Sequence, residues 1–447
     1  MQQNAKELRS RLIEKVKCAG VVGAGGAGFP THVKLQSHVE WYLANGAECE
    51  PLMHKDRELM IHFATEIVGG LQLAAQTTGN AKPAIGVKKK NTQAITALKA
   101  AIQDTRIVMA YFDDYYPAGD EYEIVYTITG RLVPPQGLPL DVGCVVNNVE
   151  TLYNVYQAEK GVPVTEKYMT IAGAVQNPVT TWVPIGMRVS DVLNLAGGAT
   201  IPYYAVMESG LMMGKYVRDI DQPVTKTTGG LIVLPADHNL ILRYSKTQKQ
   251  MDRIGHSACD QCSYCTELCP RYLLGYNVQP HLVMRSLGFS RMGAEMWNTY
   301  AQLCCQCGLC TLYACPEALY PREACVKGIN DLRALGKDKW EGAREVQVHA
   351  TKDVRRVPVK HLKTRLGVTR YEAEAGYVKM DIQPDKVVIP LKQHVGIASE
   401  PVVKEGETVN KGQLIAQIPA GQLGATIHAS ISGHVTAIQN DRIVIEA

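Results

Sequence analysis

The first patterned segment of the chain predicts a helix. Within residues 5–17 the apolar positions recur at helical spacing, so they fall on one stripe of the helix surface. These positions are Leu8, Leu12, Ile13 and Val16. Charged residues occupy much of the remaining surface, and we therefore expect an amphipathic helix that ends just before a glycine-rich loop.

Later segments carry strand and helix patterns of their own. Residues 167–198 alternate apolar and polar side chains, turn at residues 176–178 and continue into a helix from about Ser190. Residues 281–303 return to helical spacing and predict two short helices. Residues 387–447 consist of short apolar runs separated by turns, which predicts a small β domain.

Length and composition indicate a multidomain globular protein. The chain has 447 residues, whereas an ordinary domain has roughly 100 to 200. It contains no run of about 18 apolar residues that could span a membrane, and its first residues lack a signal-peptide pattern. We therefore expect a cytoplasmic protein. The formal net charge of +4 is too small to indicate nucleic-acid binding.

Cysteine spacing carries the most specific chemical signal. The stretch CDQCSYCTELCP, which begins at Cys259, contains the pattern CxxCxxCxxxCP. This pattern is typical of bacterial ferredoxins, in which three thiolates bind one [4Fe-4S] cube and the fourth reaches a second cube. The stretch CCQCGLCTLYACP, which begins at Cys304, repeats the triplet with one extra residue before its last cysteine. The sequence therefore predicts two [4Fe-4S] clusters.

Crossed ligation, as in two-cluster ferredoxins, divides eight of the thirteen cysteines into two sets. The first set is Cys259, Cys262, Cys265 and Cys315, and the second is Cys269, Cys304, Cys307 and Cys310. Zinc is the alternative, but it would leave the third cysteine of each triplet and the prolines unexplained. We expect the remaining cysteines to be small buried side chains. They are Cys18, Cys49, Cys144, Cys305 and Cys325.

A glycine-rich loop follows the predicted N-terminal helix. The stretch GVVGAGGAGFPTHVKL, residues 20–35, contains GxGxxG at Gly23, Gly25 and Gly28. A dinucleotide fingerprint leaves a strand and opens a helix, whereas this loop leaves a helix, so an NAD site here is the weaker alternative. Its glycines still leave backbone N–H groups free to face a phosphate.

Three polar segments downstream supply hydrogen-bonding groups for a phosphate-bearing cofactor. They are NGAECEP at 45–51, YPAGDEYE at 116–123 and VVNNVET at 145–151. Asparagine side chains and backbone amides suit a neutral heterocycle with a phosphate tail, which describes FMN. Each segment alone is equally well a turn between a strand and a helix, and only their combination indicates a flavin.

The motifs GAGGAGFPTHVK, NGAECEP and NNVET, in this order, resemble the FMN-binding domain shared by the NADH-oxidising subunit of respiratory complex I and the C subunit of the Rnf electron-transport complex. The resemblance implies FMN as cofactor and NADH as donor. The implied FMN-binding residues are Gly23, Gly25, Gly26, Gly28, Lys34, Asn45, Glu48, Asn147, Asn148 and Thr151. Phe29 and Glu121 would lie near the nicotinamide, and Glu48 and Glu121 are the candidate catalytic residues. Ala47 replaces an acid of the complex I motif, as in the Rnf-like branch.

Two further segments resemble modules of the same family. Residues 167–214 resemble the β-grasp-like SLBB module. Residues 387–447 resemble the barrel-sandwich fold of biotinyl and lipoyl carriers, without a carrier-lysine motif. In the Rnf C subunit this module precedes the FMN domain, whereas here it follows the cysteine block. Residues 352–370 contain seven Lys and Arg residues and one acid, which indicates a solvated face or a linker, with a docking patch as the alternative.

Together these patterns predict a multidomain α/β plus α+β protein. The expected parts are a Rossmann-like α/β FMN domain at 1–160, a β-grasp-like SLBB domain at 161–245, a helical two-cluster ferredoxin domain at 246–345, a basic linker at 346–385 and a barrel-sandwich (lipoyl-like) β domain at 386–447.

This order of modules resembles the cobalamin reductases of propanediol-utilisation bacterial microcompartments. The resemblance implies electron transfer from NADH through FMN and two clusters to cob(III)alamin or cob(II)alamin. It also implies a location inside or at the shell of a microcompartment, with a shell protein and a cobalamin adenosyltransferase as candidate partners. Two alternatives stay open, namely an Rnf-type subunit that passes electrons to another iron-sulfur protein and a non-catalytic electron-relay scaffold docked on a shell protein. The sequence does not decide between NADH and NADPH, or between a monomer and a homo-oligomer.

Overall fold

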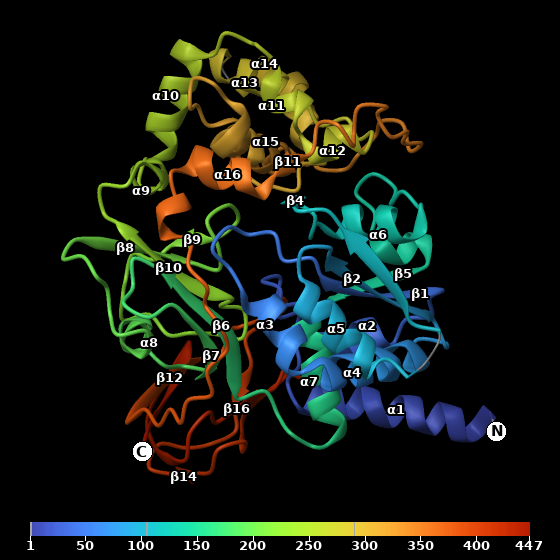
Figure 1. The fold of residues 1–447 in the computed structure, drawn as a ribbon, viewed down its shortest axis with the longest axis vertical. Coiled ribbons are helices and arrows are strands. Elements are labelled where there is room, and N and C mark those ends of the chain that lie inside the picture. Colours follow the sequence, from blue (N-terminus) through green and yellow to red (C-terminus); the bar gives the residue numbers. More distant parts are fainter. Residues whose placement is uncertain (1, 104–105, 290) are drawn as a thin grey trace.

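The computed structural model describes residues 2–103, 106–289 and 291–447 (Figure 1). The cysteine-rich helices lie at one end of the molecule, and the C-terminal strands lie at the other end. Between them, the N-terminal α/β part and a second sheet lie side by side (Figure 1). Segments far apart in the sequence therefore meet in the middle of the protein.

A four-stranded parallel sheet forms the centre of the N-terminal part, with the order β3-β2-β1-β5. Its strands are β1 (Trp41–Gly46), β2 (Lys82–Lys88), β3 (Val108–Phe112) and β5 (Cys144–Asn148). The helices around it are α1 (Gln2–Cys18), α2 (Thr31–Leu35), α3 (Lys55–His62), α4 (Ala64–Thr77), α5 (Thr92–Ala101), α6 (Glu121–Thr129) and α7 (Val149–Glu159), with a short 3-10 helix η1 (Pro139–Val142). One core joins α1, α4, α5 and α7 to the sheet and a second core joins α6 to it, so the Rossmann-like α/β prediction is confirmed.

The predicted N-terminal helix is also confirmed. Leu12 and Val16 of α1 are buried in the core of the parallel sheet, and Ile13 is partly buried beside them. The side chain of Leu8 lies outside the described residues. Because α1 runs directly into the glycine loop, the loop does not follow a strand, as the sequence indicates.

The strand order of the parallel sheet reverses at β1. Strand β1 has β2 on one side and β5 on the other, and Asn45 and Asn148 are paired neighbours at the carboxyl ends of β1 and β5. In open parallel sheets ligands bind in the crevice at such a switch point. The fold thus places two of the predicted FMN residues side by side at the position where a ligand is expected.

A five-stranded mixed sheet follows, with the order β7-β6-β10-β8-β9. Its strands are β6 (Glu166–Gly173), β7 (Val179–Pro184), β8 (Tyr204–Glu208), β9 (Lys215–Tyr216) and β10 (Gly230–Pro235), and its helices are α8 (Val189–Leu195) and α9 (Asn239–Tyr244). Strands β6 and β10 run parallel, whereas the other neighbours are antiparallel. The strand, turn and helix predicted for residues 167–198 are confirmed.

Short helices form the cysteine-rich part. They are α10 (Gln248–Ala258), α11 (Tyr264–Glu267), α12 (Pro270–Leu273), α13 (Pro280–Arg285), α14 (Arg291–Asn298) and α15 (Pro321–Ala334), with the shorter turns η2 (Ser286–Gly288), η3 (Thr299–Ala301) and η4 (Cys310–Ala314). Helices α13 and α14 account for the two helices expected between the cysteine triplets. Both cysteine runs are therefore held by loops and helix ends that pack on one another.

The basic segment is not a free linker. It forms β11 (Val357–Pro358), α16 (Val359–Leu366) and η5 (Thr369–Tyr371), and β11 pairs with β4 (Tyr115–Tyr116) of the N-terminal part. Lys352 is buried and its Nζ lies 2.6 Å from Glu123 Oε1. The expectation of a solvated linker is corrected here, because a sequence run does not reveal that a distant carboxylate neutralises one of its lysines.

Two small sheets make up the C-terminal part. Their orders are β12-β18-β17-β14 and β13-β15-β16. The strands are β12 (Lys386–Pro390), β13 (Glu400–Pro401), β14 (Thr408–Val409), β15 (Leu414–Gln417), β16 (Ile427–His428), β17 (Gly433–Gln439) and β18 (Arg442–Glu446). The part packs against the glycine loop, since Val395 N donates to Gly28 O at 3.0 Å. No helix within the described residues is long and apolar enough to cross a membrane.

Candidate functional site

A cavity of about 470 Å³ lies at the switch point of the parallel sheet, and we call it the switch-point cavity. Three parts of the chain line it. The parallel-sheet part contributes Gly25, Gly26, Asn45, Glu48, Glu121 and Asn148, the mixed sheet contributes Ser209, Met213 and Thr227, and the cysteine-rich part contributes Arg271, Cys305 and Cys307. The volume lies in the range of roughly 300 to 1,000 Å³ that is usual for cofactor pockets.

The glycine loop presents bare backbone to this cavity. Gly26 has φ +112°, which L side chains rarely adopt, and nothing lies within 4 Å of the position that its Cβ would occupy. A Cβ on Gly25 would lie 3.3 Å from Cβ of Asn148. The loop therefore keeps space open for a group that binds against main-chain N–H donors, and a phosphate tail fits it.

The strand ends hold their asparagines by specific hydrogen bonds. Asn45 Nδ2 donates to Gly119 O at 3.0 Å. Asn148 caps helix α7, because its Oδ1 accepts from Glu150 N at 3.0 Å, and its Nδ2 donates to Asp56 Oδ2 at 2.8 Å. Both side chains are thus fixed in position beside the cavity before any ligand arrives.

Three other predicted residues support the glycine loop from outside the lining. Gly23 N donates to Phe29 O at 2.9 Å, and Gly28 N donates to Gly23 O at 3.1 Å. These two bonds close the loop on itself. The structure places Gly23, Gly28 and Phe29 around the switch-point cavity and not on its surface.

The remaining predicted residues contact the lining or lie behind it. Thr151 Oγ1 accepts from Ala24 N at 3.0 Å, and Asn147 Nδ2 donates to the buried hydroxyl of Tyr42 at 2.7 Å. Lys34 Nζ donates to Val146 O at 2.8 Å and lies 3.4 Å from Glu121 Oε1. Lys34 does not line the cavity itself, but it contacts Glu121, which does.

A buried ion network lies behind the loop. Glu150 Oε2 accepts from Lys55 Nζ at 2.9 Å and from Lys167 Nζ at 2.7 Å. Burial lowers the pKa of Lys167 to about 8, although Glu150 opposes this shift. Lys167 Nζ also donates to Ala24 O at 2.9 Å, so the ion network holds the glycine loop in place.

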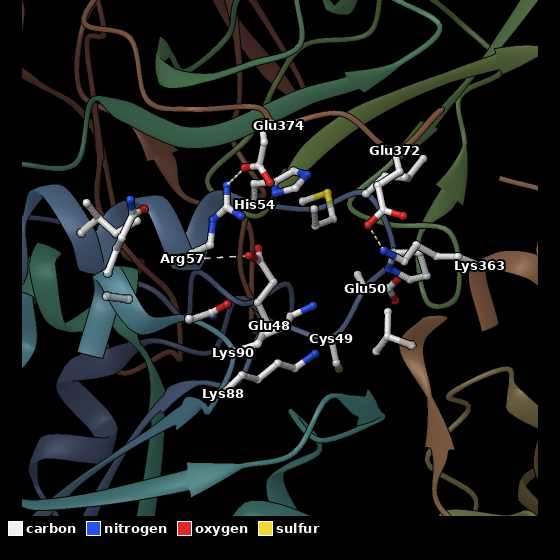
Figure 2. A pocket seen from close by; sticks show the side chains of 18 of the residues that line it. Glu48, Cys49, Glu50, His54, Arg57, Lys88, Lys90, Lys363, Glu372 and Glu374 are labelled. Carbon is white, nitrogen blue, oxygen red and sulfur yellow. Dashed lines mark hydrogen bonds and ion pairs between the residues drawn. The ribbon is translucent and has the colours of Figure 1, made fainter. Parts of the chain in front are cut away.

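Glu48 lines the switch-point cavity and a second, charged cavity of about 320 Å³. Figure 2 shows Glu48 in the middle of this charged cavity, with Lys88 and Lys90 on one side and His54 on the other. Its carboxylate accepts from Asp56 N at 3.2 Å. Burial first, and the Asp56 carboxylate next, raise the pKa of Glu48 to about 7. A carboxyl group between two cavities can thus exchange a proton near neutral pH.

The structure gathers the first predicted cysteine set around Cys265 and Cys315. Burial raises the pKa of Cys265 to about 12, with contributions from the nearby Cys315, Cys259 and Cys262. Cys262 is exposed, whereas Cys265 and Cys315 are buried. We call these four cysteines the distal set.

The second set gathers around Cys269 and Cys310. Burial raises the pKa of Cys269, and Cys304 is the first of the thiols that add to the shift. Burial also raises the pKa of Cys310, with contributions from Cys304, Cys265 and Cys269. Cys305 first, and burial next, raise the pKa of Cys307, and Cys269 and Cys310 add to this shift. We call Cys269, Cys304, Cys307 and Cys310 the proximal set.

The neighbours of Cys265 agree with crossed ligation of two cubes, whereas Cys310 also lies near Cys265, so the division into two sets stays a prediction. Among the described residues no three His, Cys, Asp or Glu side chains converge on one coordinating point. A four-iron cube offers four separate iron corners, so its thiolates need not converge as the ligands of a single ion do. The two predicted sets therefore stay the candidate ligands of two such clusters.

The proximal set adjoins the switch-point cavity. Cys307 lines this cavity, and the hydroxyl of Tyr116, which also lines it, donates to Cys307 O at 2.6 Å. A ligand in the cavity would therefore lie next to a cluster ligand. This arrangement can pass electrons between a cavity-bound cofactor and a cluster.

Four known domain families match successive parts of the chain. Residues 16–157 match the Nuo51 FMN-binding domain and residues 168–215 the SLBB domain. Residues 258–320 match the 4Fe-4S dicluster domain and residues 367–446 the RnfC barrel-sandwich hybrid domain. The predictions of a multidomain fold, of FMN and of two [4Fe-4S] clusters are confirmed.

One relative matches along the full length. The cobalamin reductase PduS of Salmonella typhimurium is 42% identical over 100% of this chain and 97% of its own length. The chain belongs to the PduS family. It is thus an oxidoreductase of the kind that the order of its modules suggests.

More distant likenesses cover less of this PduS-family chain. The C subunit of a proton-translocating ferredoxin:NAD(+) oxidoreductase complex from Clostridium ljungdahlii is 32% identical over 61% of this chain and 58% of its own length. The crystal structure of an NAD+-reducing [NiFe]-hydrogenase in the H2-reduced state matches with a TM-score of 0.50 and 21% identity, over 75% of this chain and 64% of that one. This last likeness shows the fold alone.

Sequence reasoning missed part of the cavity of this PduS-family protein. Arg271 follows the first cysteine run and Cys305 lies inside the second, yet both line the switch-point cavity. Met213 belongs to the mixed sheet, and only the likeness of ESGLMMG to the SLBB module marked its segment. No local pattern marks Arg271, because its place in the cavity depends on how the cysteine-rich part docks on the parallel sheet.

Proposed function

We propose that this protein is an NADH-dependent cobalamin reductase. Electrons would pass from NADH through FMN and two [4Fe-4S] clusters to cob(III)alamin or cob(II)alamin. The supporting observation is the switch-point cavity, which borders both the predicted flavin residues and the cluster ligand Cys307. The full-length likeness to a cobalamin reductase supports the acceptor.

The residues around the cavity would bind and orient the cofactor and the donor. FMN, when bound, accepts a hydride from NADH and releases single electrons, which one-electron clusters require. The N–H groups of Gly25 and Gly26 would hold its phosphate, and Asn45 and Asn148 would hold its ring. Glu121 would contact the nicotinamide, with Lys34 fixing Glu121, and Phe29 would lie near the donor behind the glycine loop.

The positions of the cysteines support an order of transfer. The proximal set would receive electrons first, because Cys307 lines the cavity. The distal set would release them, because Cys262 is exposed. Cobalamin would therefore be reduced at the end of the molecule that carries the distal set.

An anaerobic titration of the purified holoenzyme tests this function. Adding NADH should bleach the absorbance of the flavin and of the clusters, and cob(II)alamin added afterwards should yield cob(I)alamin. If neither NADH nor NADPH bleaches the flavin or the clusters, the protein is an electron-relay scaffold and not a nicotinamide-dependent oxidoreductase. Repeating the titration with NADPH decides which nicotinamide is the donor.

An Rnf-type role is the second candidate, because the likeness to the C subunit of a ferredoxin:NAD(+) oxidoreductase complex covers 61% of the chain. In that role the distal set would reduce another iron-sulfur protein. The two functions separate in one assay, since only the Rnf-type role requires a protein acceptor before NADH oxidation becomes continuous. Reoxidation of the flavin by ferredoxin but not by cobalamin would favour the Rnf-type role.

The proposal also covers where the protein is located in the cell and which proteins it contacts. The family membership supports a place inside or at the shell of a bacterial microcompartment, with a shell protein and a cobalamin adenosyltransferase as neighbours. The four domain ranges expected on either side of the corrected linker stay part of the proposal, as does a homo-oligomer. Co-purification of the tagged protein with shell fragments would test the location, and its molar mass in solution would test the oligomer.

Glu48 should make stability depend on pH. Its pKa is about 7 in the folded protein against an ordinary value of 4.5, so its contribution is fully present below about pH 4.5 and is lost as the pH rises through 7. Glu48→Gln should therefore gain stability relative to the parent as the pH rises from 5 to 8, by at most about 3 kcal/mol. Thermal unfolding of the holoenzyme at several pH values measures this difference.

A matched control lies in the same charged cavity. Glu372 is 48% exposed, and Glu372→Gln should leave the pH dependence of unfolding unchanged. Parallel pH profiles of the parent and Glu48→Gln would show that Glu48 does not titrate in this range.

A further inference from the structure

Arg271 extends from the cysteine-rich part into the switch-point cavity. It belongs to α12 and lies two residues after the cluster ligand Cys269, yet its side chain is buried, and the residue is only 8% exposed. Its Nη2 donates to Asp120 Oδ2 at 2.9 Å, and its guanidinium lies 3.5 Å from the ring centroid of Tyr122. Both partners belong to the parallel-sheet part, so Arg271 spans the junction between the two parts.

Arg271 keeps its charge in this position. Burial alone would lower the pKa of Arg271, but Asp120 and next Cys305 raise it above the ordinary value. Asp120 also caps α6, since its carboxylate accepts from the N–H groups of Tyr122 and Glu123. One carboxylate therefore serves both a helix and the guanidinium, and it compensates Arg271 only in part.

One donor of Arg271 has no acceptor. Its Nε is buried and has no hydrogen-bond partner among the described residues. A buried donor without a partner is unfavourable, so such atoms call for an explanation. Arg271 lines the cavity that fits a flavin, so its guanidinium lies beside the space that the cofactor would occupy.

Cys305 connects Arg271 to the proximal set. Cys305 follows the cluster ligand Cys304 in the chain and lines the switch-point cavity together with Arg271 and Cys307. It is not needed for either cube. The doubled cysteine at 304 and 305 thus combines a cluster ligand with a second thiol that faces the cavity.

We propose that Arg271 and Cys305 form a charged link between the flavin and the proximal cluster, and that this link raises the reduction potential of that cluster. The inference rests on the proposed function, because it takes FMN to occupy the switch-point cavity. Arg271 would contact the flavin, and Cys305 would act as a positioning residue through Cys307.

The direction of the effect follows from charge. Reduction adds an electron to a cluster that is already anionic, and a buried cation nearby favours the reduced form. Hydrogen bonds to the ligand sulfurs act in the same direction, and they are known determinants of cluster potentials. The link would make the proximal cluster a better acceptor for electrons from the cavity.

Redox titration of the holoenzyme, followed by electron paramagnetic resonance with mediators, tests the link. The proximal signal is the one that Cys269→Ser removes. Arg271→Met should make the reduction of this cluster at least tenfold less favourable, which is a shift of about 59 mV for one electron, while the distal signal keeps its potential. Cys305→Ala should shift it in the same direction, and Arg271→Lys and Cys305→Ser should restore part of the shift.

Two controls separate the link from a structural role. Arg131 pairs with Glu40 on the outside of the same α/β part, and Arg131→Met should leave both potentials unchanged, as should Cys18→Ala. Should Arg271→Met fail to retain its clusters, Arg271→Lys and Cys305→Ala decide the question. A proximal potential that stays at the parent value in variants with full FMN content overturns the link.

The titration does not depend on NADH or on cobalamin. Potentials that shift as expected without cob(I)alamin formation would overturn the proposed acceptor and keep the link. Unchanged potentials with active cobalamin reduction would overturn the link and keep the proposed function.

Discussion

Replacing Cys269 with serine should stop the transfer of electrons from NADH to cobalamin while NADH still bleaches the flavin. Cys269 lies among Cys304, Cys307 and Cys310, next to the switch-point cavity, so its loss removes the first cluster on the path. Residues outside a metal site already change affinity or activity by about 10 to 100-fold, and we expect loss of a ligand to lower cobalamin reduction by roughly 100-fold or more. Stopped-flow absorbance under anaerobic conditions measures both steps.

Cys262→Ser is the matched variant in the distal set. Here NADH should bleach the flavin and one cluster, and cobalamin should still not be reduced. Cys18 is exposed and belongs to neither set, so Cys18→Ser should behave as the parent. The order of the clusters is reversed if Cys269→Ser keeps an NADH-reducible cluster and Cys262→Ser does not.

Removing the carboxylate of Glu150 should destabilise the protein more than any other single change considered above. Glu150 is 1% exposed and is the common partner of Lys55 and Lys167. Its loss leaves two buried ammonium groups with reduced compensation, and breaking such a buried pair costs about 3 to 5 kcal/mol. Urea unfolding of Glu150→Ala and Glu150→Gln measures the cost.

The same variants should also bind FMN less tightly, because Lys167 holds the glycine loop at Ala24 O. Glu159 lies on the same helix α7 and pairs at the surface with Arg11 and Lys15. Glu159→Gln should cost less than about 1 kcal/mol and should leave the FMN content unchanged. Equal stability of the Glu150 and Glu159 variants would show that the buried network contributes nothing.

Much of the fold follows from local sequence patterns. The stripe that includes Leu12 and Val16 predicts α1, and the alternation in residues 167–198 predicts β6, β7 and α8. These elements are readable because each buries one face, so its period appears in the sequence. The basic segment is different, since the burial of Lys352 depends on Glu123, which is far away in the chain.

Some residues of the candidate site could likewise be predicted from the sequence, and others could not. Asn45 and Asn148 could be predicted, because they end strands of one parallel sheet and carry a family motif. The cysteine sets followed from spacing alone. Arg271 and Cys305 could not be predicted as cavity residues, because they reach the cavity only through the docking of two separate parts. Periodicity and motifs describe one segment at a time, so they do not show how two separate parts of the chain pack together.

The contact between the C-terminal part and the glycine loop has an evolutionary consequence. Val395 bonds to Gly28, and Thr426 Oγ1 donates to Lys17 O at 3.0 Å, so the barrel-sandwich module touches the start of the FMN-binding module. A module in this place can be joined to the chain ahead of the glycine loop or behind the cysteine block with the same spatial neighbours. Circular permutation of a common ancestor would thus account for the two module orders without any rearrangement of the electron path.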